Sequence, residues 1–107
     1  MQGWLRNLAV LSLLLWPNPA AAIDEEIYEK MPPGEAKELV FGHCSACHSM
    51  KLVVQQGLSR DGWADVLDYM FKEQGMMELS ADERRRILDY LACWYGEDRA
   101  ATKREKP

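Results

Sequence analysis

The chain has 107 residues, with 13 Lys and Arg against 17 Asp and Glu and a formal net charge of −4. This length predicts one domain, and the acidic balance excludes the basic face that nucleic-acid binding requires. A core this small usually needs a staple, such as a disulfide, a metal or a covalently bound group.

Residues 1–22 have the features of a cleaved secretory signal peptide. Arg6 supplies a positive charge, residues 8–16 form an apolar run, and Ala20-Ala21-Ala22 offers a small-residue cleavage site. We expect cleavage after Ala22 and export to the periplasm. An uncleaved membrane anchor is the alternative, although the run is much shorter than the ~20 residues that span a bilayer. The mature chain keeps 12 Lys and Arg against 17 Asp and Glu, a charge of −5, and we expect no membrane span in it.

Residues 23–33 are predicted to form an acidic, solvated arm that ends at a Pro-Pro-Gly sequence. A domain of residues 34–97 follows. Its first helix is expected over residues 35–43, since Pro33 suits an early helix position and apolar residues recur at Ala36, Leu39, Val40 and Phe41.

This helix leads into Cys44-Ser45-Ala46-Cys47-His48, whose C-x-x-C-H spacing indicates a c-type haem attachment site. We expect Cys44 and Cys47 to form thioethers with the two vinyl groups of one haem c, and His48 to be the fifth iron ligand. Two alternatives are a redox-active thiol pair, which needs a βαβ context, and a zinc site, which usually needs a second ligand pair. His43 is the only other histidine.

The remainder of the chain predicts two further helices and no strands, so the fold class is all-α. Residues 49–58 are an apolar connection that is expected to line the haem. A second helix over residues 59–75 has Ser59 as N-cap, an apolar face and Gly75 at its end. A third begins at the capping box of Ser80 and Glu83 and stops at Gly96. Residues 98–107 are predicted to be a polar, basic tail.

A helix entering C-x-x-C-H, a middle helix, and a last helix after a methionine-bearing loop together resemble a class I cytochrome c. The resemblance implies a small fold of three main helices around one covalent haem, in which the first and last helices cross at a small residue and an aromatic one. Ala36 and Tyr90 are the candidates here, although the family usually has glycine at the first of these positions.

The same resemblance implies a sixth iron ligand in the loop before the last helix. Met76 matches that placement, with Met70 and Met77 as alternatives, and His43 or an open site as further possibilities. The family commonly has a proline whose carbonyl accepts from the axial histidine. This chain has no proline between His48 and Pro107, so we expect a carbonyl of residues 50–54 to replace it.

Three other side chains have two interpretations each. Trp63 is expected in the core, with a hydrogen bond to a haem propionate as the alternative. Arg60 either pairs with a propionate or is exposed. Cys93 is expected to be a buried helix residue, and intermolecular pairing in an oxidising compartment is the alternative.

About half of the mature chain looks like the small haem c subunit of bacterial sulfite dehydrogenases. The shared segments are residues 44–49, Leu52-Val53, residues 56–60, Trp63, residues 73–76 and residues 89–92. The resemblance implies a periplasmic monohaem electron carrier rather than an enzyme, with a molybdenum-containing dehydrogenase subunit as its redox partner. A haem protein with an open or labile sixth position, binding a gas or acting like a peroxidase, is the alternative.

Overall fold

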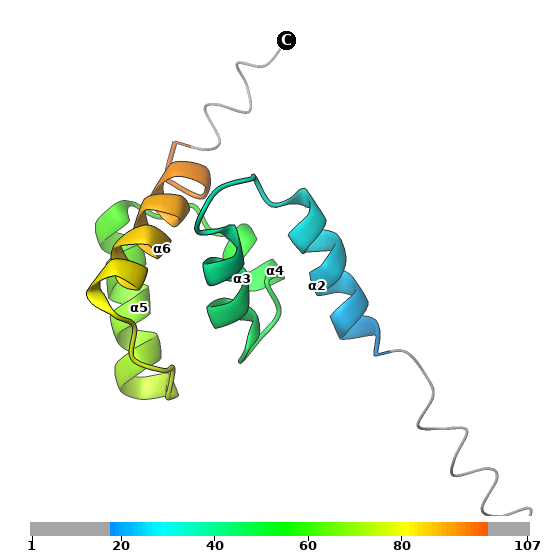
Figure 1. The fold of residues 1–107 in the computed structure, drawn as a ribbon, viewed down its shortest axis with the longest axis horizontal. Helices are drawn as coiled ribbons and strands as arrows, with labels where there is room; N and C mark the ends of the chain where they lie inside the picture. Colours follow the sequence, from blue (N-terminus) through cyan, green and yellow to red (C-terminus); the bar gives the residue numbers. More distant parts are fainter. Residues whose placement is uncertain (1–17, 99–107) are drawn as a thin grey trace, which may run out of the picture.

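The computed structural model describes residues 18–98, and over this range the chain is mostly helical and contains no strand (Figure 1). The elements are α2 (Pro19–Lys30), α3 (Lys37–Ser45), α4 (Lys51–Val54), α5 (Arg60–Gln74) and α6 (Ala81–Trp94). The all-α prediction is therefore confirmed. Residues 1–17, which hold most of the expected signal peptide, and residues 99–107 of the expected tail lie outside the described range. No helix within residues 18–98 is long and apolar enough to cross a membrane.

α2 makes most of the predicted acidic arm of residues 23–33 helical, although none of the residues of this helix is buried. The helix begins where the Asn18 side chain accepts a hydrogen bond from the Ala20 N–H at 3.1 Å, with proline at the first helical position. Its Tyr28 ring packs edge-on against Phe41 of α3, with 4.8 Å between centroids. Ile27 and Tyr28 are partly buried against the core, whereas Glu25, Glu26 and Glu29 are exposed.

α2 also runs through the expected cleavage point between Ala22 and Ile23. Cleavage there would remove the first turn and leave a helix that starts with Asp24, Glu25 and Glu26. Acidic side chains are stabilising at the positive N-terminal end of a helix. The charges near the N-terminus of the shortened helix would therefore interact more favourably with the helix dipole than those of the uncleaved helix.

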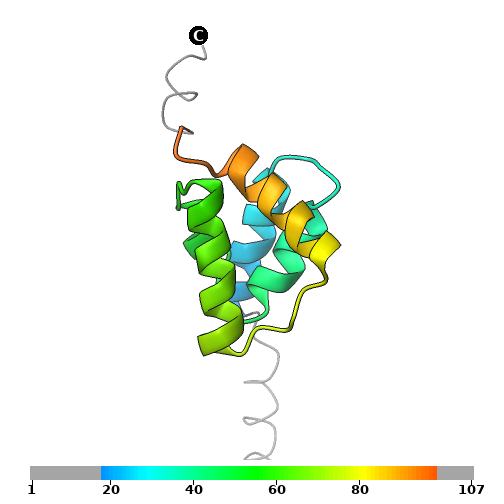
Figure 2. The same ribbon diagram turned by 90° about the vertical axis from the view of Figure 1, so that its left-hand side faces the viewer.

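α6 is the central element, since both α3 and α5 pack against it (Figure 2). Ala36 and Tyr90 are each 5 % exposed and belong to the same core. The Tyr90 ring lies 3.4 Å from the position that a Cβ on Gly34 would occupy, and its hydroxyl donates to the Pro32 carbonyl at 2.6 Å. Tyr90 thus holds the segment before α3 against α6.

The ends of α5 and α6 follow the predicted capping residues. The Ser59 hydroxyl accepts from the Gly62 N–H at 3.0 Å, and Gly75 ends α5 with a φ of 73°, in the left-handed region. The Ser80–Glu83 capping box has both of its hydrogen bonds, and these lower the pKa of Glu83. α6 stops at Trp94, just before Gly96, where a Cβ would stand 2.5 Å from the Ala92 carbonyl oxygen.

In Figure 1, α3 and α4 lie between α2 on one side and the pair of α5 and α6 on the other. The core that joins them contains twelve buried apolar residues: Met31, Ala36, Val40, Met50, Val53, Trp63, Leu67, Ile87, Leu88, Tyr90, Leu91 and Tyr95.

Candidate cofactor site

The C-x-x-C-H motif straddles the end of α3. Cys44 lies in the last turn of the helix, and Cys47 and His48 follow in the turn after it. Cys44 and His48 are half-buried and Cys47 is exposed. All three side chains line one cavity of about 380 Å³. The motif residues therefore share one hollow rather than pointing to different parts of the surface.

This cavity is mainly apolar and lies within the ~300–1,000 Å³ range of ordinary small-molecule sites. α4, α5 and α6 supply most of its walls, through Leu52, Val53, Trp63, Val66, Leu67, Met70 and Leu91. Leu58, from the connection between α4 and α5, adds a further apolar side chain, and Gln56 and Gln74 add two amides. The predicted lining by residues 49–58 is present in part. A large apolar ring system suits such walls, because hydrophobic burial needs no directional partner.

The burial of the Cys44 thiol is relevant to the two alternatives to haem attachment, a redox-active thiol pair and a zinc site. Burial raises the pKa of the Cys44 thiol to about 11. Thiol exchange and zinc binding both use the thiolate, which this environment disfavours. Within residues 18–98, no group of three or more His, Cys, Asp or Glu side chains is placed to hold a metal ion. The donor set that lines the cavity is two thiols and two imidazoles, from Cys44, Cys47, His43 and His48.

The His48 ring is oriented by its neighbour. Its Nδ1 lies 3.3 Å from the Ser49 carbonyl oxygen, and since a carbonyl can only accept, the hydrogen bond requires the proton on Nδ1. The Nε2 lone pair then remains available to a metal. The acceptor belongs to Ser49 and not to residues 50–54 as predicted, because the turn after His48 brings the next carbonyl onto the ring.

Two of the three candidate methionines reach the cavity. Met70 lines it from α5 and Met76 from the loop that follows, whereas Met77 is 76 % exposed and is not among the lining residues. The left-handed Gly75 reverses the chain here, and the Met76 N–H donates to the Met70 carbonyl at 3.0 Å. His43 also lines the cavity.

Trp63 and Arg60 both have partners within the protein. Trp63 is buried and its indole N–H donates to the Tyr95 carbonyl at 3.0 Å, so the core interpretation is confirmed and that N–H is engaged. Arg60 is exposed and pairs with Asp89 of α6. Both side chains connect the N-terminal part of α5 to α6 or to the residue that follows α6.

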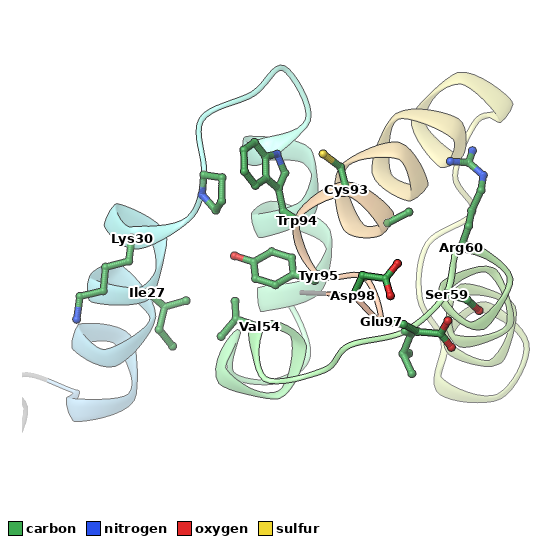
Figure 3. Close-up of a pocket in the computed structure, with 14 residues that line it drawn as sticks. Ile27, Lys30, Val54, Ser59, Arg60, Cys93, Trp94, Tyr95, Glu97 and Asp98 are labelled. Atoms are coloured by element: carbon green, nitrogen blue, oxygen red, sulfur yellow. The ribbon is translucent and has the colours of Figure 1, made fainter. Parts of the chain in front are cut away.

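A larger cavity of about 830 Å³ lies elsewhere, between α2 and the C-terminal end of α6 (Figure 3). Figure 3 shows Ile27 on one side of it and Cys93 on the other. None of the C-x-x-C-H residues lines this cavity, so its size does not make it the site of the chemistry. Cys93 is exposed, which corrects the prediction that it is buried.

Two hydrogen bonds beside the motif had no signal in the sequence. Asp24 of α2 accepts hydrogen bonds from the Ser49 hydroxyl at 2.8 Å and from the Met50 N–H at 2.9 Å. The acidic arm thus contacts the turn directly after His48. A separation of 25 residues and an ordinary Asp–Ser pair offered nothing by which to predict it.

Comparisons of this chain with family models, with curated proteins and with solved structures found no match in any of the three.

Proposed function

We propose that this chain is an exported class I c-type cytochrome that carries one haem c and transfers single electrons. The observation that carries the proposal is the convergence of Cys44, Cys47 and His48 on one apolar cavity that Met76 also lines. The two sulfurs hold the haem, and the chain is an electron-transfer protein rather than an enzyme. The class I arrangement of three main helices around the haem is part of the same proposal.

The chain's own residues have separate roles in this proposal. When bound, the haem supplies one-electron chemistry at its iron. His48 is the fifth ligand through the Nε2 atom that its hydrogen bond leaves available. Met76 is the sixth ligand, with Met70 as the alternative, and a thioether raises the reduction potential relative to a second imidazole. The apolar walls limit the access of water to the haem, and this burial also influences the reduction potential.

Covalent attachment of the haem is tested by whether the denatured protein keeps its haem. The full chain is expressed in cells that attach haem c, and the exported protein is extracted with acid acetone. We expect the colour to stay with wild type and with Cys93→Ser, and to be lost from the Cys44→Ser/Cys47→Ser double variant. Colour that leaves the wild-type protein would contradict the proposal. Cys93→Ser is the matched control, because Cys93 is an exposed cysteine outside the cavity.

External ligands distinguish the capped iron from the open or labile sixth position. Carbon monoxide is added to the reduced protein and cyanide to the oxidised protein. Two methionines on the cavity wall favour a capped iron, so we expect slow binding of both. Prompt binding would instead assign gas binding or peroxidase-like chemistry.

The proposed location is the periplasm, as the features of residues 1–22 indicate. The resemblance to the small haem c subunit of sulfite dehydrogenases supports a molybdenum-containing dehydrogenase subunit as redox partner. Mixing the purified protein with such a subunit should give sulfite-dependent reduction of the haem. No reduction would argue against this partner and leave the electron-transfer role to another one.

A further inference from the structure

We propose that Asp24 is a positioning residue for the axial histidine, an inference that rests on the proposed function. One carboxylate oxygen of Asp24 accepts from both the Ser49 hydroxyl and the Met50 N–H, at 2.8 and 2.9 Å. The carbonyl of the same Ser49 accepts from His48 Nδ1 at 3.3 Å. Asp24 therefore fixes the residue that orients the His48 ring.

The contacts hold this turn from two sides. The Ser49 hydroxyl donates to Asp24 and also accepts from the Lys51 N–H at 3.2 Å, which ties it to the start of α4. Met50, whose N–H is the second donor to Asp24, is 0 % exposed. Hydrogen bonds to an ionised carboxylate are about twice as strong as neutral ones. Rotation of the residue 49 carbonyl away from the ring would thus disturb several contacts at once.

The chain needs such a device because it has no proline between His48 and Pro107 to restrict the backbone after the motif. A group that accepts from the second nitrogen of a ligating imidazole fixes the ring and raises its basicity as a ligand. A more basic imidazole favours the oxidised metal. Loosening the turn should therefore raise the reduction potential. Asp24 is the second residue after the expected cleavage point, so processing would retain its side chain.

The test uses the haem-loaded protein and two readouts, the midpoint reduction potential and the electron paramagnetic resonance spectrum of the oxidised form. Asp24→Ala should raise the potential and shift the g values, which report the orientation of the axial imidazole. Asp24→Asn keeps an acceptor oxygen without the charge and should give a smaller shift. Glu25→Ala is the matched control, since Glu25 is an exposed acidic neighbour on the same helix, and it should match wild type.

A double-mutant cycle tests the route through Ser49. Ser49→Ala removes the hydroxyl but keeps the carbonyl and the bond between Asp24 and the Met50 N–H, so its shift should be smaller than that of Asp24→Ala. The double variant should shift by less than the sum of the two single variants, because both changes remove the Asp24–Ser49 hydrogen bond, while Ser49→Ala also removes the acceptor of the Lys51 N–H.

Several results would overturn the inference. One such result is that haem-loaded Asp24→Ala has the same reduction potential and g values as Glu25→Ala. A merely structural role for Asp24 predicts this pattern, even if the stability of Asp24→Ala is lower. If Asp24→Ala does not accumulate, Asp24→Asn and Ser49→Ala carry the test, and unchanged values in both would overturn it. Wild-type protein without covalent haem would instead refute the proposed function.

Discussion

At the scale of single residues, two adjacent methionines have different environments. Met76 lines the C-x-x-C-H cavity and Met77 is exposed. We predict that Met76→Ala abolishes the red-region absorption band of methionine-ligated ferric haem, and that Met77→Ala, its matched control, keeps it. The oxidised visible spectrum of each variant is the measurement. A band that survives in Met76→Ala and disappears in Met70→Ala would assign the ligand to Met70.

Tyr90 predicts a pH dependence of stability. Burial, with a smaller contribution from neighbouring tyrosines, raises its pKa to about 12, and its hydroxyl donates to the Pro32 carbonyl. An unfolded tyrosine has a pKa of about 10, so the folded state holds the proton more tightly. Its contribution to stability is complete below about pH 10 and is lost as the pH rises towards about 12.

Denaturant unfolding of Tyr90→Phe checks this contribution. Loss of the hydrogen bond should lower the free energy of unfolding by about 1 kcal/mol at neutral pH. The further decrease between about pH 10 and about pH 12 should be smaller in the variant than in wild type. Parallel pH profiles of the two proteins would show that another group causes the alkaline loss.

At the scale of elements, helix ends that depend on capping residues could be predicted, and tertiary contacts could not. Ser59, Gly75 and the Ser80 capping box define their ends through bonds to neighbours a few residues away, so local sequence suffices. α2 was missed because its stability includes the contact between Tyr28 and Phe41. The short α4 was missed for a similar reason, since its Val53 is buried against distant residues.

Two glycines should respond with opposite signs to the same substitution. Gly75 has a left-handed backbone, and nothing lies within 4 Å of the position that a Cβ would occupy, so Gly75→Ala should cost about 1–2 kcal/mol through backbone strain alone. Gly42 lies inside α3 with equally open space, and Gly42→Ala should stabilise the protein by about 0.5–1 kcal/mol. Free energies of unfolding of the haem-loaded variants are the measurement. A neutral or stabilising Gly75→Ala would refute the role given to this turn.

At the scale of the whole molecule, the candidate site combines residues from one short segment with residues that the fold brings together from distant parts of the chain. The grouping of Cys44, Cys47 and His48 on one cavity could be expected from the sequence, because the C-x-x-C-H spacing keeps them within one segment. The choice among methionines depends on how the chain turns after α5, and the Asp24 contact depends on where α2 docks. The position of Met76 before the last helix gave a partial signal for the first, whereas the Asp24 contact had none, because it joins segments 25 residues apart along the chain.

The proposed function depends above all on one haem bound covalently to an exported, processed chain. The intact mass of the wild-type protein, recovered from the periplasm and measured under denaturing conditions, reports both features together. We expect the mass of residues 23–107 plus that of one haem. The mass of the bare polypeptide, from cells that attach haem to another c-type cytochrome, would refute the proposal.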